Sequence, residues 1–238
     1  MDPILNHEVP PDGQSPEINP YQAPRAPPSQ LWPQLPPPYP AWSQQSRFEP
    51  LEAYVWIASI AIFLFVASGL VLDTVILLAV HHPLLQLLSA LATLIHSFAF
   101  LMAGIFFLVW VHRAARNVQT LGRPGLHLTP GWCVGWFFVP VASLVMPYRA
   151  LSQIWHASDP GIGLGIQFWR TTPLLPLWWG TYLASSLLTR SSALFASNLK
   201  VMGTVELIGN LLGAVAALSI TLVMREVTTN QRKIASTS

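Results

Sequence analysis

Charged side chains are scarce in this chain of 238 residues, of which only 9% are Asp, Glu, Lys or Arg. A soluble domain carries about 25% of such residues, so this chain has too little charge to cover a water-facing surface. Hydrophobic residues make up 52% of the sequence, and the mean hydropathy is +0.47. The composition excludes an ordinary soluble domain and predicts an integral membrane protein.

Cysteine and catalytic patterns are also lacking. The single cysteine, Cys133, excludes an intrachain disulfide and a cysteine-based zinc site. The basic residues are too dispersed for a nucleic-acid-binding surface. No Ser/His/Asp arrangement and no closely spaced pair of carboxylates points to catalysis. We therefore expect neither enzyme activity nor a cofactor or metal site.

Residues 1–50 hold 14 of the 22 prolines and no apolar run. Such a segment cannot bury enough surface to offset the entropy lost on ordering, so we predict a disordered cytoplasmic leader with polyproline II character. It also lacks the apolar stretch of a signal peptide. Residues 35–40 fit the P-P-x-Y pattern that WW modules bind. The plainer interpretation of this stretch is a low-complexity tether.

Residues 51–228 are predicted to form an all-α integral membrane domain, and residues 229–238 a short cytoplasmic tail. A membrane-spanning helix needs about 20 mainly apolar residues. Four transmembrane helices are therefore expected, the first of which can continue to Val80. They cover approximately residues 53–72, 84–111, 171–189 and 201–224.

A fifth apolar run, 132–146, is too short to be a fifth span. Its 15 residues would extend about 22 Å as a helix, whereas the hydrocarbon core is about 30 Å thick. Pro140 lies in its middle, and Pro130 and Pro147 flank it. Because proline removes a helix hydrogen bond, we predict a short re-entrant or interfacial hairpin.

The distribution of Lys and Arg supports this hairpin. If the run does not cross the membrane, ten basic residues share one side and only Arg190 and Lys200 lie opposite. If it crosses, the split becomes seven to five. The positive-inside rule favours the first arrangement, which puts both termini and residues 113–170 in the cytoplasm of a multi-pass cell-membrane protein.

The stretch between the second and third spans is predicted to contain two further helical features. Residues 112–117 extend the second span out of the membrane, and Leu121-Gly122 ends that helix. Residues 148–158 are then expected to form an amphipathic helix in the plane of the interface. Its apolar face carries Leu151, Ile154, Trp155 and Ser158. Its polar face carries Arg149, Gln153 and His156.

Three motifs of this region resemble a known family. They are R-A-A-R-N at 113–117, T-P-G-W-C-V-G-W-F-F-V-P at 129–140 and P-Y-R-A at 147–150. Together they resemble a bacterial membrane family, the domain of unknown function 4328, over about residues 53–230. The resemblance implies a multi-span bacterial membrane protein and no particular activity. Its motif residues here are Arg113, Arg116, Asn117, Pro130, Gly131, Trp132, Gly135, Trp136, Pro140, Pro147 and Tyr148.

Five polar residues are predicted to meet in the outer leaflet, because polar side chains inside a membrane usually face other helices. Two interpretations of this polar cluster remain open. It can be a proton, cation or ligand site, or a set of interhelical hydrogen bonds that fixes packing. The cluster consists of Asp73 in the first span, Thr93 and His96 in the second, and Glu206 and Asn210 in the fourth.

The fourth span also carries Gly209 and Gly213, four residues apart. Small residues at this spacing let two helix backbones approach closely. The contact can lie within the helix bundle or between two copies of the chain.

Two functions remain compatible with these patterns. The first is a non-enzymatic membrane scaffold or interaction protein, whose proline-rich leader and hairpin recruit protein partners. The second is a small transporter or channel-like subunit that uses Glu206, Asn210 and His96. A polar cluster whose members bond to one another favours the scaffold, whereas convergence on a water-filled cavity favours transport.

Overall fold

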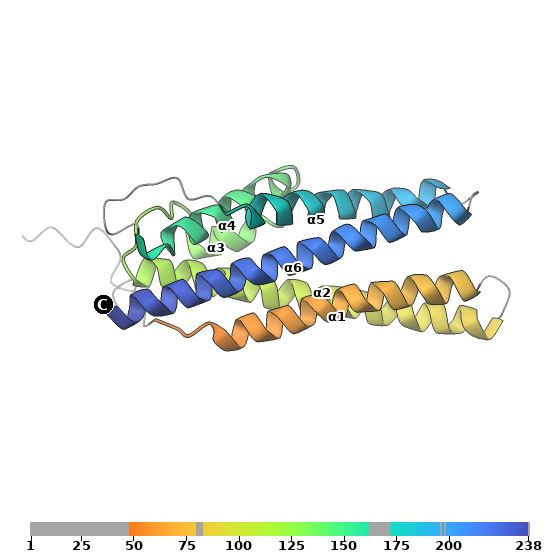
Figure 1. The fold of residues 1–238 in the computed structure, drawn as a ribbon, viewed down its shortest axis with the longest axis horizontal. Coiled ribbons are helices and arrows are strands. Elements are labelled where there is room, and N and C mark those ends of the chain that lie inside the picture. The colour runs from red at the N-terminus through yellow and green to blue at the C-terminus, as the bar shows by residue number, and fades with distance from the viewer. Residues whose placement is uncertain (1–47, 80–82, 162–171, 196, 198, 238) are drawn as a thin grey trace, which may run out of the picture. The chain divides into compact units, whose positions relative to one another are not determined.

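The computed structural model describes residues 48–79, 83–161, 172–195, 197 and 199–237. All regular structure in these ranges is helical (Figure 1). Residues 1–47 of the predicted leader, which include the P-P-x-Y stretch, and residues 80–82 lie outside the described residues.

Three helices are long and apolar enough to cross a membrane, and they match three of the predicted spans. Helix α1 covers Glu52–Ala79, α2 covers Pro83–Thr120 and α6 covers Leu199–Thr237. The first span does continue beyond residue 72. The chain thus has the architecture of a helical membrane protein.

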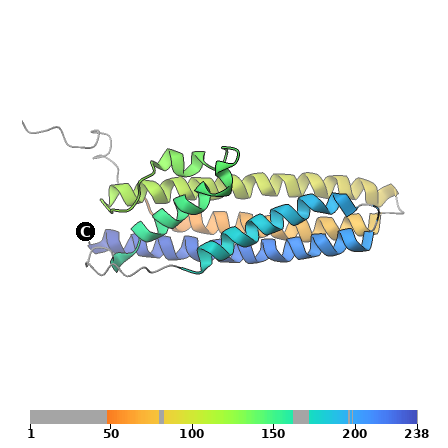
Figure 2. The ribbon, with the colours of Figure 1, turned by 90° about the horizontal axis from the view of Figure 1, so that it is seen from above.

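Helix α5 (Leu174–Ser191) occupies the place of the predicted third span. Its 18 residues extend about 27 Å, and it packs along α6. Helices α1 and α2 form a second pair, and contacts between α1 and α6 join the two pairs (Figure 2).

The predicted end of the second helix is confirmed. Gly122 adopts a φ of 60°, in the left-handed region that favours glycine. The amide of Gly122 donates to the Gln119 carbonyl, and the amide of Arg123 donates to Val118 O at 3.1 Å. These bonds satisfy carbonyls that the last turn of α2 leaves unpaired.

The short apolar run forms a hairpin of α3 (Pro130–Gly135), the 3₁₀ turn η2 (Ala142–Leu144) and α4 (Met146–Ala157). Pro130 is the first residue of α3, and the Thr129 hydroxyl accepts a hydrogen bond from the Trp132 amide at 3.3 Å. After the hairpin, the chain is back beside the end of α2, where Arg123 Nε donates to the Ala157 carbonyl at 3.3 Å. The segment 123–157 therefore begins and ends at the same end of the helix bundle.

Helix α4 is amphipathic as predicted, but its apolar face contacts protein and does not face lipid. Leu151, Ile154 and Trp155 are buried together with residues of α2 and α6, whereas Arg149 is exposed. The amphipathic pattern of a sequence does not distinguish an apolar face that contacts lipid from one that packs against protein. The apolar sides of α2 and α6 are close enough here to cover α4, so the expected interfacial placement of its apolar face is wrong.

Helix α6 continues past the predicted end of the fourth span at residue 224 and reaches Thr237. The segment predicted as a cytoplasmic tail is thus the last part of α6. Its buried Gln231 contacts α2 and the end of α4. We call the end of the bundle where α2 and α6 finish the arginine-rich end.

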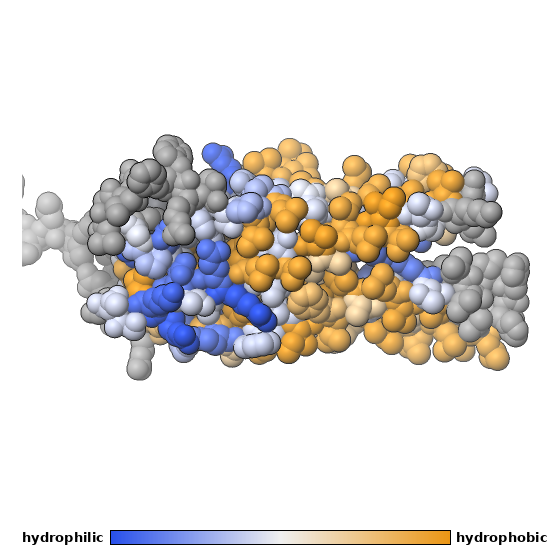
Figure 3. Space-filling model, viewed as in Figure 1, coloured by the Kyte–Doolittle hydropathy of each residue, from blue (hydrophilic) through white to orange (hydrophobic). Residues whose placement is uncertain are grey.

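The densest core lies at the arginine-rich end. It is built around Trp110, Val111 and Ala114 of α2, with side chains from α4 and α6. Trp110 Nε1 donates to Thr228 Oγ1 of α6 at 3.3 Å. Away from this end the surface is mainly apolar, as the large hydrophobic area in Figure 3 shows.

Candidate functional site

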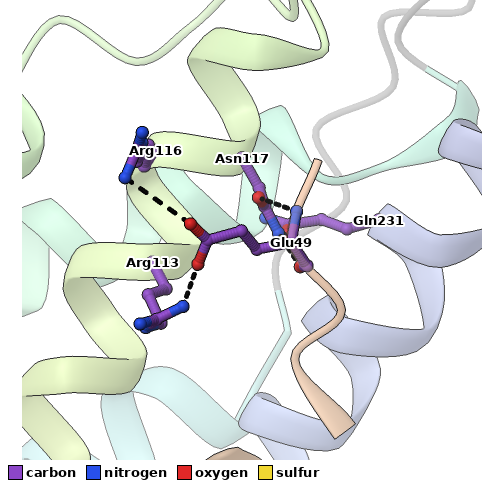
Figure 4. A network of polar contacts seen from close by, with 5 residues as sticks. All are labelled: Glu49, Arg113, Arg116, Asn117 and Gln231. Atoms are coloured by element: carbon purple, nitrogen blue, oxygen red, sulfur yellow. Dashed lines mark hydrogen bonds and ion pairs between the residues drawn. The ribbon is translucent and has the colours of Figure 1, made fainter. Parts of the chain in front are cut away.

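Glu49, just before α1, makes the most extensive set of polar contacts at the arginine-rich end (Figure 4). Its carboxylate pairs with Arg113 and, at 3.5 Å, with Arg116. The Asn117 side chain accepts a hydrogen bond from the Glu49 amide at 3.1 Å and donates to the Glu49 carbonyl at 2.8 Å. The side-chain amide of Asn117 thus pairs with both backbone groups of Glu49, as the backbone of a neighbouring segment would.

Gln231 of α6 completes this arrangement from the other side. Its Oε1 accepts from Asn117 Nδ2 at 3.2 Å. Its Nε2 donates to the Ala114 carbonyl at 3.0 Å and to Ser158 Oγ at 2.9 Å. Asn117 is 1% exposed and Gln231 is fully buried. We call Glu49, Arg113, Arg116, Asn117 and Gln231 the Glu49 network, which joins α2, α4 and α6 to the start of α1.

The R-A-A-R-N motif explains why α2 can hold this network. Its two alanines, Ala114 and Ala115, are fully buried and leave room for α4 and α6 to approach. Its two arginines lie on the side of α2 that faces Glu49. The Arg113 guanidinium also lies over the Tyr54 ring, 4.2 Å from its centroid, a favourable cation–π geometry.

Glu49 and Gln231 were both missed as site residues. Glu49 was assigned to the leader, but residues 48–50 are described and Glu49 contacts α2. Gln231 was assigned to the tail. Neither residue belongs to a motif or an apolar run, so only the fold brings them to Asn117.

The aromatic and proline residues of the second and third motifs build the hairpin. Trp132 and Trp136 pack with their ring centroids 4.9 Å apart. A Cβ atom on Gly135 would lie 3.3 Å from the Trp132 ring. Pro147, in the first turn of α4, is buried. Of the remaining motif residues, Gly131 lies in α3, Pro140 in the tip and Tyr148 in α4.

The tip of the hairpin exposes large apolar side chains. Phe138, Val141 and Leu144 are exposed, Val141 to 80%. Trp179 of α5 donates from Nε1 to the Leu144 carbonyl at 2.9 Å, and the Phe137 ring packs edge-on against Phe107 of α2. The tip therefore lies against apolar parts of α2 and α5.

The backbone of the tip bonds mainly to itself. Val141 has a φ of 65°, and around it the Ala142 amide donates to the Pro140 carbonyl at 2.7 Å, which makes a γ-turn. Ser143 donates to Val139 O at 2.8 Å. Backbone at membrane depth must find its hydrogen bonds within protein. These internal bonds, together with the exposed apolar side chains, suit a tip that enters the hydrocarbon.

Four of the five residues of the predicted polar cluster face the junction of α1, α2 and α6. Asn210 Nδ2 donates to the Asp73 carboxylate, and Glu206 is close enough to Asp73 for their carboxylates to interact. His96 Nδ1 lies 3.0 Å from Ser68 Oγ. A Cβ atom on Gly69 would touch both His96 and Asn210, at 3.2 and 3.6 Å, so His96 and Asn210 share one neighbourhood.

Thr93 is not part of this grouping. Its side chain is exposed, and its hydroxyl donates to the Ser89 carbonyl of its own helix at 2.8 Å. Glu206, in contrast, has a partner in the 3₁₀ turn η4 (Ser192–Phe195), which precedes α6, since Ser192 Oγ donates to its Oε1 at 3.0 Å.

A groove of about 690 Å³ between α1 and α2 is lined almost entirely by apolar side chains. Among the described residues that line it, Ser68 alone contacts the polar grouping, and none of the five predicted cluster residues is included. Among the described residues, no group of three His, Cys, Asp or Glu side chains is arranged to hold a metal ion. The polar cluster residues thus have one another and nearby hydroxyl groups as neighbours.

The sequence model of one protein family, described as a domain of unknown function (DUF4328), matches residues 73–229. The chain belongs to the DUF4328 family. Comparisons with curated proteins and with solved structures gave no match. The DUF4328 match includes the polar cluster, the hairpin and the R-A-A-R-N motif. Glu49 and Gln231, which complete the Glu49 network, lie outside the matched range.

The single cysteine provides a test of how α3 packs. Cys133 is fully buried, and burial raises the pKa of its thiol to about 11. At pH 8 only about one thiol in a thousand is then ionised, compared with about one in four for a free cysteine of pKa about 8.5. We expect maleimide labelling at pH 8 to be at least about 100-fold slower in the folded protein than in SDS. The labelling rate should rise with pH up to the raised pKa. Rapid labelling of the folded protein, measured by mass spectrometry, would show that α3 does not pack as described.

Proposed function

We propose that this DUF4328 protein is a non-enzymatic membrane scaffold that holds its proline-rich leader at a fixed point on the cytoplasmic face of the cell membrane. The observation that carries the proposal is the Glu49 network. Glu49 lies at the C-terminal end of the leader, and its backbone and carboxylate contact α2 through several independent bonds. Because Glu49 is held against α2, the leader joins the membrane domain at a fixed position. A fixed attachment point suits a leader that presents binding motifs to protein partners.

The proposal includes a four-span topology, with α1, α2, α5 and α6 as the spans. Helix α5 is about 27 Å long and packs along α6, which supports its assignment as a span. Of the exposed basic residues, Arg116 and Arg232 lie at the arginine-rich end, whereas Arg190 lies at the other end of α5. The positive-inside rule puts the arginine-rich end in the cytoplasm.

Comparison of the full chain with a chain that lacks residues 1–47 tests the scaffold function. Both proteins should reach the membrane and melt at the same temperature in detergent, since Glu49 is retained. Partners that co-purify with the full chain from crosslinked native membranes should be lost with the leader. Retention of every partner after the deletion would contradict the proposal.

The transport alternative is tested at Glu206. Glu206→Gln keeps an oxygen that can accept the Ser192 hydrogen bond. Glu206→Leu loses this bond and leaves the Ser192 hydroxyl with the Thr189 carbonyl as its acceptor. We expect Glu206→Gln to melt like the parent and Glu206→Leu to lose about 0.5–1.5 kcal/mol of stability, the net value of one hydrogen bond. Thermal melting of both variants in the same detergent makes the comparison. A pH-dependent ion flux that both variants abolish while keeping parental melting temperatures would instead support transport.

A further inference from the structure

The outward stripe of α6 changes abruptly from apolar to polar. Exposed residues recur on one face at steps of three, four or seven positions. Up to residue 222 they are leucines, and from residue 225 they are polar or charged. In order they are Leu207, Leu211, Leu218, Leu222, Arg225, Thr229 and Arg232. Such a change on a lipid-facing helix marks the boundary of the hydrocarbon.

The outward stripe of α1 changes at the same level. Trp56, Phe63 and Leu70 are exposed on one face, and Glu52 lies one turn before Trp56. Two contacts align the stripes of α1 and α6. Arg232 pairs with Glu52 at 3.4 Å, and the Arg225 guanidinium lies over the Trp56 ring, 4.9 Å from its centroid. In Figure 3, hydrophilic and hydrophobic areas meet across the face on which α6 and α1 lie toward the viewer.

Arg225 differs from the other arginines that contact α1. Arg113 and Arg232 each have a carboxylate partner, Glu49 and Glu52 respectively. Among the described residues, Arg225 has no carboxylate within ion-pair distance, and its guanidinium lies over the indole of Trp56, which is itself 59% exposed. Its guanidinium is held at the hydrocarbon boundary with its hydrogen-bond donors available to an anion.

We propose that Arg225 and Trp56 form a binding site for the phosphate of an anionic phospholipid in the leaflet at the arginine-rich end. The guanidinium offers two parallel donors to a phosphate, and the indole suits the headgroup level. The acyl chains then lie along the exposed apolar residues of the paired stripes, such as Leu222, Leu218 and Phe63. This site does not depend on the scaffold function.

Titration of the purified full chain with phosphatidylglycerol tests the site. The protein is held in micelles that contain phosphatidylcholine, and the apparent affinity is read from the rise in melting temperature. We expect Arg225→Gln to bind phosphatidylglycerol about fivefold more weakly, which corresponds to about 1 kcal/mol for one basic residue near an anionic surface. Arg149→Gln, which removes an exposed arginine from α4, should bind like the parent.

Further variants and ligands make the result specific. Arg225→Lys keeps the charge but loses the planar donors, so its affinity should lie between those of the parent and Arg225→Gln. Trp56→Leu should also weaken binding. Unchanged affinity of Arg225→Gln, or an equal effect of phosphatidylcholine, would overturn the proposal. If glycerol phosphate alone raises the melting temperature as much, the site binds free phosphate and the assignment to a lipid is wrong.

Discussion

Replacement of Asn117 by leucine is expected to lower the free energy of unfolding by about 2–5 kcal/mol. The leucine fills a similar volume, but it leaves the backbone groups of Glu49 and the side chain of Gln231 without partners. Each buried group left unpaired costs about 1–3 kcal/mol, and Asn117 and Gln231 are both buried. Thermal melting in a mild detergent measures the change.

Gln119→Leu is the matched control for Asn117→Leu. It makes the same kind of exchange, amide for aliphatic, two residues further along α2, where the side chain is exposed. Its free energy of unfolding should change by no more than about 0.5 kcal/mol, as for ordinary surface substitutions. Equal effects of the two substitutions would contradict the role assigned to the Glu49 network.

Gly209→Val is expected to destabilise the protein by about 1–3 kcal/mol through overpacking. A Cβ atom at Gly209 would lie 2.9 Å from Thr189 Cγ2 and 3.5 Å from Leu188 Cβ, both on α5. At Gly213 it would lie 3.1 Å from Ser185 Oγ. Both glycines therefore face α5 of the same chain, which was one of the two arrangements expected from their spacing.

Gly203→Val is the control for Gly209→Val, because Gly203 lies on the same helix and a Cβ atom there would meet nothing within 4 Å. Its free energy of unfolding should lie within about 0.5 kcal/mol of that of the parent. Side-by-side melting curves decide the comparison. If Gly209→Val melts like Gly203→Val, α5 does not pack closely on α6 at this point.

The long helices could be predicted because length and apolar composition are properties of each segment alone. The end of α2 at Gly122 could also be predicted, since glycine followed by proline stops a helix. Charge counting predicted a hairpin at 132–146, because basic residues flank the run on both sides, and the structure forms a hairpin there with α4 as its return arm. The helices and the helix end depend on local sequence alone, and the charge count had only two topologies to choose between.

Features that depend on which surfaces meet could not be predicted. The pattern of α4 predicts one apolar face but does not say that α2 and α6 cover it. Thr93 was grouped with His96 because a step of three residues stays near one face, yet the fold exposes Thr93 and turns His96 toward Ser68. Glu49 and Gln231 have no local signal, because their partners are distant in sequence.

Sidedness is the most direct test of a scaffold that presents its leader in the cytoplasm. In a Cys133→Ala background, single cysteines replace the exposed residues His127 and Ser236 at the arginine-rich end and Ser197 at the opposite end. Intact cells are treated with a membrane-impermeant maleimide, before and after permeabilisation. We expect the cysteine at position 197 to be labelled in intact cells and those at positions 127 and 236 to be labelled only after permeabilisation. Labelling of the cysteine at position 127 in intact cells would contradict this expectation.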